Sequence, residues 1–215
     1  MDKIIEHYDK AYFDDYQKKI GEFGGLANKF KFQGEIHSDN TVLDFGCGGG
    51  FLLQNLSCKY KIGIEINEVA RNHCKSLGIE CYDSLDNVED ESIDVIVSNH
   101  CLEHIENPYL AISQLYKKLK CGGKIIIFVP LESYKCKWST ADVNHHLYSF
   151  SPMNLGNLLQ SAGFKNIRTG ALLHKWMPHY DKVYKLSGYK IFHFLSWLYG
   201  HYNKHSVQVR GLGIK

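Results

Sequence analysis

The sequence predicts an α/β fold built around a doubly wound, mainly parallel sheet. Two observations lead to this class. Short apolar runs of strand length alternate along the chain with segments of helical periodicity, which is the pattern of repeated βαβ units. The first run, Thr41 to Phe45, leads directly into the glycine-rich turn Gly46 to Gly50 and then into the apolar segment 51–56. Strand, glycine turn and helix in this order build a nucleotide-binding crevice in α/β sheets.

The remaining strands and helices follow from apolar runs and from the residues that bound them. Further buried strands are expected at 60–66, 79–82, 93–99 and 124–130. Three helices are expected between or after them, each opened by a capping residue or proline and stopped by glycine. Their predicted starts and stops are Asn67 and Gly78, Asn107-Pro108 and Cys121-Gly122-Gly123, and Ser151-Pro152 and Gly163.

We expect one domain over residues 1–215, in three parts. Residues 1–34 are predicted to form a helical cap with a break at Gly24-Gly25, and residues 35–170 the ligand-binding core. Residues 171–215 are rich in aromatic side chains and are expected to form a helix and a final strand. The helix is expected to pack across the last two strands. An aromatic lid, a homodimer face and contact with a membrane surface are the alternatives.

Composition limits the classes of function. The 215 residues, 44% apolar and 22% charged, fit one globular domain. A net charge of +2 is too small to predict binding to nucleic acid or to an anionic membrane. The seven cysteines are not arranged in metal-type pairs, and we expect reduced thiols in a cytoplasmic protein. We also expect neither a signal peptide nor a membrane-spanning segment.

The glycine pattern distinguishes between nucleotide ligands. Counting from Gly46 leads to Gly48 and then to Phe51, where a dinucleotide site needs a third glycine. What remains is Asp-x-Gly-x-Gly-x-Gly, with Asp44 in the strand, and a second acid, Glu65, near the end of the next apolar run. A carboxylate at that place can accept hydrogen bonds from both hydroxyls of a ribose. With these residues the chain resembles the class I S-adenosylmethionine-dependent methyltransferases, and a nicotinamide oxidoreductase becomes a weak rival.

The resemblance covers most of residues 35–170. It implies a methyltransferase with a Rossmann-like sheet of seven strands, the last of them antiparallel, and S-adenosylmethionine as cofactor with S-adenosylhomocysteine as product. It also implies that Gly46, Cys47 and Gly48 line the methionine end of the cofactor and that Asp44 orients its amino group.

The resemblance further implies residues for the other parts of the cofactor. Glu65 would bind the ribose hydroxyls and Ile66 would pack on the adenine. Asp83 and the backbone N–H of Ser84 would bind the adenine edge. The end of the fourth strand, Asn99-His100, would pass beneath the sulfonium.

Two histidine clusters are candidates for the chemistry. The first is His100-Cys101-Leu102-Glu103-His104, after the fourth strand, and the second contains His145 and His146, after the fifth strand. Loops at the carboxyl ends of parallel strands share one crevice, so the clusters are expected to meet. Histidine suits proton transfer because its ordinary pKa is near 6.5. We therefore expect His104 with His145 or His146 to act as base and to position the acceptor; a purely structural role is the alternative.

A divalent metal is a second interpretation of the same residues. His100, Glu103 and His104 share a face if this turn is helical, and His145 or His146 could complete the ligand set. Some metal-assisted O-methyltransferases carry Glu-x-x-Glu-His here, and this chain departs from them at His100. Ligation rich in nitrogen would favour Mn²⁺, Fe²⁺ or Zn²⁺ over Mg²⁺.

The acceptor is expected to be a small polar molecule, methylated on oxygen rather than nitrogen. The string from Asp142 to Pro152 resembles small methyltransferases of bacterial surface-polysaccharide synthesis. That resemblance implies a sugar, a nucleotide-sugar or a phosphate-containing capsule precursor. An alternative of another class is a subunit that binds S-adenosylmethionine without catalysing transfer.

Overall fold

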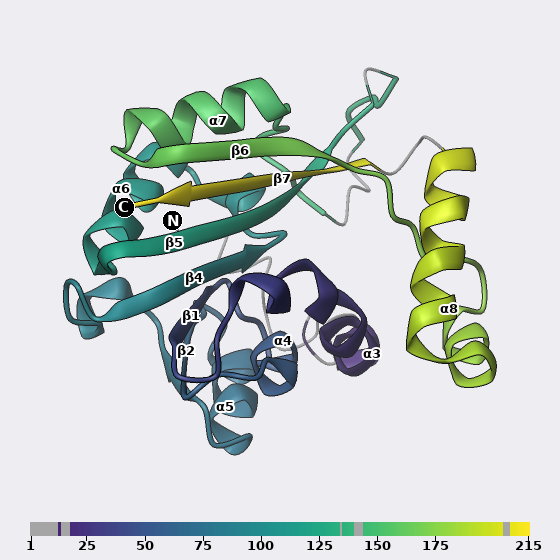
Figure 1. Ribbon diagram of the computed structural model, residues 1–215, viewed down its shortest axis with the longest axis horizontal. Coiled ribbons are helices and arrows are strands. Elements are labelled where there is room, and N and C mark those ends of the chain that lie inside the picture. The colour runs from purple at the N-terminus through teal and green to yellow at the C-terminus, as the bar shows by residue number, and fades with distance from the viewer. Residues whose placement is uncertain (1–12, 14–17, 134, 140–143, 204–206) are drawn as a thin grey trace.

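The computed structural model describes residues 13, 18–133, 135–139, 144–203 and 207–215. It confirms the predicted class, since one seven-stranded sheet with the strand order β3-β2-β1-β4-β5-β7-β6 runs through the molecule (Figure 1). Strands β1 to β5 pair in parallel, whereas β7 lies antiparallel between β5 and β6. The strands are β1 (Thr41–Phe45), β2 (Tyr60–Ile64), β3 (Glu80–Tyr82), β4 (Ile93–Asn99), β5 (Leu119–Leu131), β6 (Lys165–Leu172) and β7 (Val207–Ile214).

Apolar side chains on both faces of the sheet explain why its central strands are continuous apolar runs. Val42 and Leu43 are neighbours in β1 and are both fully buried, yet they belong to different core clusters. Successive side chains of a strand point to opposite faces, so the sheet has a core on each side. Burial on both faces is the usual situation of parallel strands that are covered by helices.

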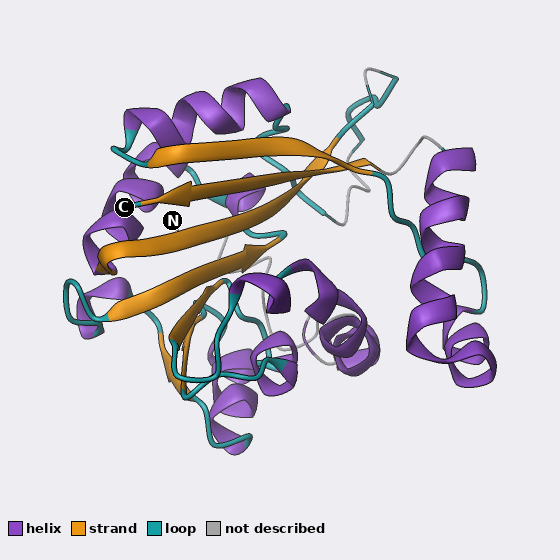
Figure 2. Cartoon of the chain, viewed as in Figure 1, coloured by secondary structure: helices purple, strands orange, loops and turns teal. Residues whose placement is uncertain are grey.

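The helices begin where the sequence predicted. Asn67 accepts hydrogen bonds from the backbone N–H groups of Val69 and Ala70, and Ser151 forms a capping box with Asn154. Figure 2 shows the helices in purple around the sheet. They are α3 (Lys18–Asn28), α4 (Phe51–Asn55), α5 (Glu68–Ser76), α6 (Pro108–Lys118), α7 (Pro152–Ser161) and α8 (Tyr180–Tyr202), with the short 3₁₀ helices η2 (Lys29–Lys31), η3 (Gln33–Glu35), η4 (Leu85–Asn87) and η5 (Leu102–His104).

The predicted helix break at Gly24-Gly25 is wrong, because both glycines lie inside α3. A side chain at position 25 would collide with the backbone carbonyl of Phe51 in the turn of α4. Gly25 is therefore present for close packing of α3 on α4, and not to end a helix. The part of the predicted N-terminal cap at residues 1–12 and 14–17 lies outside the described residues.

Two further predictions on the elements need correction. The predicted glycine stop after α6 lies within β5, which begins at Leu119 and contains an irregular register opposite β4. Helix α8 does not lie across the last two strands. It stands beyond the carboxyl ends of the parallel strands (Figure 1), where its Phe192 packs on Phe23 of α3 with ring centroids 5.5 Å apart. Among the described helices, none is long and apolar enough to cross a bilayer.

Candidate active site

The turn after β1 forms a cavity of about 360 Å³ at the carboxyl edge of the sheet. Gly46 and Gly48 have φ angles of 79° and 53°, a left-handed conformation that glycine adopts without a steric penalty. The same turn is anchored from below, since the backbone N–H groups of Gly46 and Cys47 both donate to the carbonyl of Ile64. The walls of the cavity come from β1, the turn, α3, α4, the end of β4 and the segment before α8. They include Asp44, Gly46, Cys47, Gly48, Asn99, His100 and Trp176.

Asp44 is the unusual group of this cavity. Its side chain is buried, and its Oδ1 atom has no hydrogen-bond partner among the described residues. Burial, together with the nearby Glu65, raises the pKa of Asp44 to about 8. A buried carboxyl oxygen without a partner is costly unless a ligand supplies a donor. The cavity therefore fits a ligand that carries an ammonium or another strong hydrogen-bond donor at this point.

Glu65 follows β2 and holds the turn through its carboxylate. Its Oε2 atom accepts from the Gly48 N–H and its Oε1 atom accepts from the Asn67 N–H, both at 2.8 Å. Burial is the main cause that raises the pKa of Glu65, and these two backbone bonds oppose it. The side chain thus links the glycine turn to the start of α5.

The residues predicted for the adenine end are more exposed. The Ile66 side chain is 48% exposed, as expected of an apolar side chain that a ligand could cover. Asp83 is exposed as well, while the Ser84 hydroxyl caps η4 by accepting from the Asp86 N–H. Neither Asp83 nor Ser84 lines the 360 Å³ cavity.

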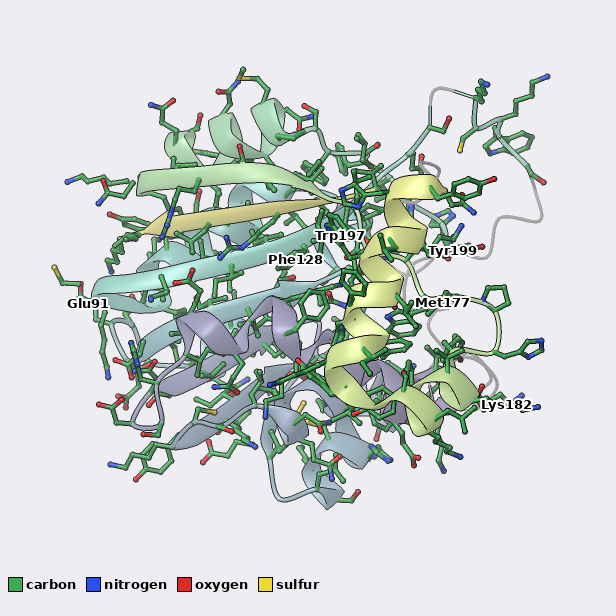
Figure 3. The ribbon with its side chains drawn as sticks, turned by 45° about the vertical axis from the view of Figure 1, so that its right-hand side comes forward. Glu91, Phe128, Met177, Lys182, Trp197 and Tyr199 are labelled. Carbon is green, nitrogen blue, oxygen red and sulfur yellow. The ribbon has the colours of Figure 1, made fainter. Side chains whose placement is uncertain are left out.

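A second cavity of about 430 Å³ adjoins the first and shares Asn28, His100 and Trp176 with it. Lys31, from η2, lies in its wall although only 7% of the side chain is exposed. The Lys31 Nζ donates to Asn99 Oδ1 at 2.9 Å and to Gln208 Oε1 at 2.6 Å. It also lies 5.1 Å from the centre of the Phe128 ring, which is labelled in Figure 3. Burial lowers the pKa of Lys31 to about 7.

Sequence reasoning did not find Lys31. The local signal was weak: Lys31 stands between Phe30 and Phe32, where lysine and phenylalanine alternate, and the aliphatic stem of a lysine can pack on apolar neighbours while its charge stays in water. The other residues that line the second cavity are aromatic, basic or neutral: Asn28, His100, His174, Lys175, Trp176, Tyr180 and Gln208. No aspartate or glutamate is among the described residues of this wall.

The structure brings the two histidine clusters together around one carboxylate. Glu103 is fully buried, and neither of its carboxylate oxygens has a hydrogen-bond partner among the described residues. Its Oε1 atom lies 3.4 Å from His100 Nδ1, 3.8 Å from His104 Nε2 and 4.0 Å from His146 Nε2. His146 in turn contacts Glu132 at 2.7 Å through its Nδ1 atom.

The three predicted catalytic histidines lie outside the walls of both cavities. His104, His145 and His146 line neither of the two cavities, whereas His100 lines both. Burial is the main cause that lowers the pKa of His104, and a hydrogen bond to the His145 backbone opposes it. Among the described residues, Glu103, His104 and His146 bring possible metal-ligand atoms within 4.8 Å of one another, and His145, whose side chain is exposed, is not in this group.

A thiol cluster lies below the glycine turn. Cys47, Cys74 and Cys81 are buried together, with Cys47 Sγ 3.5 Å from Cys81 Sγ. Hydrogen bonds with the neighbouring thiols of Cys74 and Cys81, followed by burial, raise the pKa of Cys47 well above its ordinary value. The Cys47 side chain is therefore a packing group at the base of the turn.

Comparisons with known proteins agree with this geometry. A family model described as a methyltransferase domain matches residues 8–169. The chain is 27% identical over 204 residues to an uncharacterised protein of Methanocaldococcus jannaschii, covering 88% of this chain and 92% of that protein. It is 31% identical over 144 residues to a ubiquinone biosynthesis O-methyltransferase of Xanthomonas euvesicatoria, covering 52% of this chain and 60% of the relative.

The fold also has solved counterparts. An S-adenosylmethionine-dependent methyltransferase from Thermotoga maritima superposes with a TM-score of 0.71 at 19% identity, over all of both chains. The family match covers well over half of the chain. The chain therefore belongs to the methyltransferase-domain family and is an S-adenosylmethionine-dependent methyltransferase.

Proposed function

We propose that S-adenosylmethionine binds with its methionine end in the 360 Å³ cavity, against Asp44 and the Gly46-Cys47-Gly48 turn. The observation that carries this assignment is the buried, unpartnered Oδ1 atom of Asp44. The α-ammonium of the cofactor would supply the missing donor and a compensating charge. Glu65 would then bind the ribose hydroxyls with lone pairs that its two backbone bonds leave available.

The adenine and the sulfonium of the cofactor would be bound by residues at or after the ends of later strands of the sheet. Ile66 would cover the adenine, and Asp83 with the Ser84 N–H would bind the adenine edge. Asn99 and His100 line this cavity, and both would lie beneath the sulfonium; His100 also lines the second cavity.

We propose the 430 Å³ cavity as the acceptor site and transfer to an acceptor oxygen as the reaction. Trp176 and Tyr180 offer aromatic faces on which a sugar ring can pack, and Lys31 and Lys175 offer positive charge without an opposing carboxylate in the described wall. These features support a glycan-related acceptor that carries a phosphate or a carboxylate, such as a sugar phosphate or a nucleotide-sugar. The ubiquinone relative methylates a different kind of substrate, as its name states, and covers only part of this chain.

The reaction is a displacement in line with the breaking bond. The acceptor oxygen forms a bond to the methyl carbon, the bond from that carbon to sulfur breaks, and the electron pair stays on sulfur, which leaves S-adenosylhomocysteine. The hydroxyl proton goes to a base. We propose that His100, which lines the cavity, is this base. Glu103, His104 and His146 lie behind it, and His145 fixes the His104 ring through its backbone. The walls align the two reactants and exclude water.

A panel of acceptors tests this function. Formation of S-adenosylhomocysteine would be measured with neutral sugars, sugar phosphates, nucleotide-sugars and primary amines at equal concentration. We expect turnover with a phosphorylated sugar or nucleotide-sugar and little with the neutral sugar or the amine. Turnover confined to amines, or cofactor binding without turnover on any acceptor, would contradict the proposal; the second result would indicate a non-catalytic binding subunit.

A metal-assisted mechanism is the second candidate, because Glu103 presents two buried carboxylate oxygens without hydrogen bonds among the described residues. Together with His104 and His146 it would provide a mixed nitrogen and oxygen ligand set for a divalent cation such as Zn²⁺ or Mn²⁺. The ion would supply Lewis-acid polarisation of an acceptor oxygen. Metal analysis of the purified protein and of Glu103→Gln separates the two candidates: one bound equivalent that the variant loses favours the metal, and none in either protein favours the base.

A further inference from the structure

The outer side of α8 carries an exposed apolar face. After the non-helical residue Gly188, the helix places a set of large side chains at spacings of three and four residues, which keeps them on one side. Their exposed fractions range from 44% to 90%. We call this set the α8 outer face: Ile191, Phe194, Trp197, Leu198 and Tyr202.

The opposite side of α8 is fixed to the molecule, so the outer face cannot turn inward. Phe192, Ser196 and Gly200 recur every four residues and are buried. Phe192 packs on Phe23 of α3 with ring centroids 5.5 Å apart. At Gly200 a Cβ atom would lie 2.8 Å from the Leu173 carbonyl oxygen, a separation that real Cβ atoms do not show.

Positive charge lies at the N-terminal end of this apolar face. Between residues 175 and 203 the chain has four lysines and a single acid, Asp181. Lys182, Lys185 and Lys190 are exposed on α8, and Figure 3 labels Lys182 and Trp197 on this helix. The charge of the whole chain is only +2, so the basic character is local.

We propose that the α8 outer face binds the surface of an anionic lipid bilayer. Aromatic and aliphatic side chains beside lysines are the composition of helices that lie in the membrane interface, and each lysine near an anionic surface adds attraction. No described helix is long and apolar enough to cross the bilayer. A second copy of the chain fits the face less well, because two-fold pairing brings the same patch, with its lysines, against itself.

Vesicle binding tests this inference with the chain of 215 residues. The probes are vesicles of phosphatidylcholine alone and vesicles with phosphatidylglycerol added, separated by flotation. We expect binding to the anionic vesicles that weakens as salt is raised. The double variant Phe194→Ser/Trp197→Ser should lose about tenfold or more of the partitioning, and Lys182→Gln/Lys185→Gln/Lys190→Gln should lose about fivefold per lysine.

The matched control is Trp138→Ser, since Trp138 is 89% exposed outside α8; it should bind vesicles like the wild type. Thermal unfolding and S-adenosylhomocysteine binding should be unchanged in every variant, which separates a binding defect from misfolding. Equal binding by wild type and the Phe194/Trp197 variant would overturn the inference. So would a dimer, seen by light scattering and dispersed by the same variant, that does not bind either kind of vesicle.

Discussion

Each of the two adjoining cavities has a buried ionisable residue in its wall. Burial shifts the pKa of both residues in the direction that favours the uncharged side chain. The pKa of Asp44 is raised to about 8, which favours the protonated carboxyl, and that of Lys31 is lowered to about 7, which favours the neutral amine. Each shift is reversed by a ligand of opposite charge. Asp44 therefore favours a cationic ligand in one cavity and Lys31 an anionic ligand in the other.

Replacement of Lys31 by methionine tests the acceptor side. We expect kcat/KM for an anionic acceptor to fall about 30-fold or more, because the buried partner of the anion is lost. In the wild type, Lys31 is charged below about pH 7, so KM for that acceptor should rise as the pH rises through 7. Steady-state kinetics across pH, with Lys31→Arg as the charge-retaining variant, measure both effects.

Several groups face Lys31 and belong in the interpretation of that pH profile. Glu103 acts on it as an opposite charge, and Lys31 acts in turn on His174, whose pKa is lowered to about 4 mainly by burial. His174 is thus neutral across the pH range of interest. A Lys31→Met enzyme with unchanged KM and an unchanged profile would show that the acceptor does not meet this side chain.

The sequence predicted the residues whose partners lie nearby in the chain and missed those with distant partners. Asp44, Gly48 and Glu65 were predicted as cofactor residues, and the hydrogen bond from the Gly48 N–H to the Glu65 carboxylate shows that the last two lie together. Lys31 depends on Gln208, a residue 177 positions away, so no local pattern could assign its role. For the same reason the sequence could not decide between His145 and His146 as the neighbour of Glu103.

At the scale of elements, short glycine-containing contacts position the cavity walls. Gly25 of α3 lies directly on the backbone of Phe51, whereas a Cβ atom at the adjacent Gly24 would be 3.6 Å from Trp176 and would fit. The sequence showed two glycines and favoured a break; the structure shows that one provides close packing and that the helix continues through both. Periodicity alone cannot distinguish these uses of glycine.

Alanine at position 25 should destabilise the protein, and alanine at the adjacent position 24 is the control. Gly25→Ala should lower the free energy of unfolding by about 1–3 kcal/mol, because the new methyl group forces α3 away from α4. Gly24→Ala should leave it unchanged or raise it by about 0.5–1 kcal/mol, through better helix propensity. Urea unfolding followed by circular dichroism measures both, and equal effects of the two variants would contradict the packing account.

Element boundaries were predicted best where a cap or a buried run sets them. Strands β1 and β4 have the predicted bounds, and Asn67 and Ser151 cap α5 and α7 as expected. Helix α8 was predicted as an element but placed wrongly. Its aromatic residues pack on α3 rather than on β6 and β7. Both are apolar surfaces, and the local sequence of α8 does not determine on which of them the helix packs.

For the whole molecule, the glycine turn, the end of β4 and α3 come from three parts of the chain and meet at one cavity. A ligand in this cavity joins them, so it should stabilise the complete fold. At a concentration of S-adenosylhomocysteine about 100 times its Kd, the added stability is about 2.7 kcal/mol. For a chain of 215 residues this corresponds to a rise of about 5–10 °C in Tm, measurable by differential scanning calorimetry.

The control ligand for that experiment is NAD, which contains adenosine but has no α-ammonium that could bind Asp44. We expect no rise in Tm with NAD at the same concentration. A rise with NAD and none with S-adenosylhomocysteine would assign the cavity to a dinucleotide.

The most direct measurement is calorimetric titration of S-adenosylhomocysteine into the wild type and into Asp44→Asn between pH 6 and pH 8. Ionisation of Asp44, whose pKa is about 8 in the free protein, favours the ammonium of the ligand. We therefore predict micromolar binding to the wild type that tightens by about tenfold per pH unit from pH 6 to pH 7, and much weaker, pH-independent binding to the variant. Absence of binding to the wild type, or equal affinity of the two proteins, would contradict the assignment of this cavity to the methyl donor.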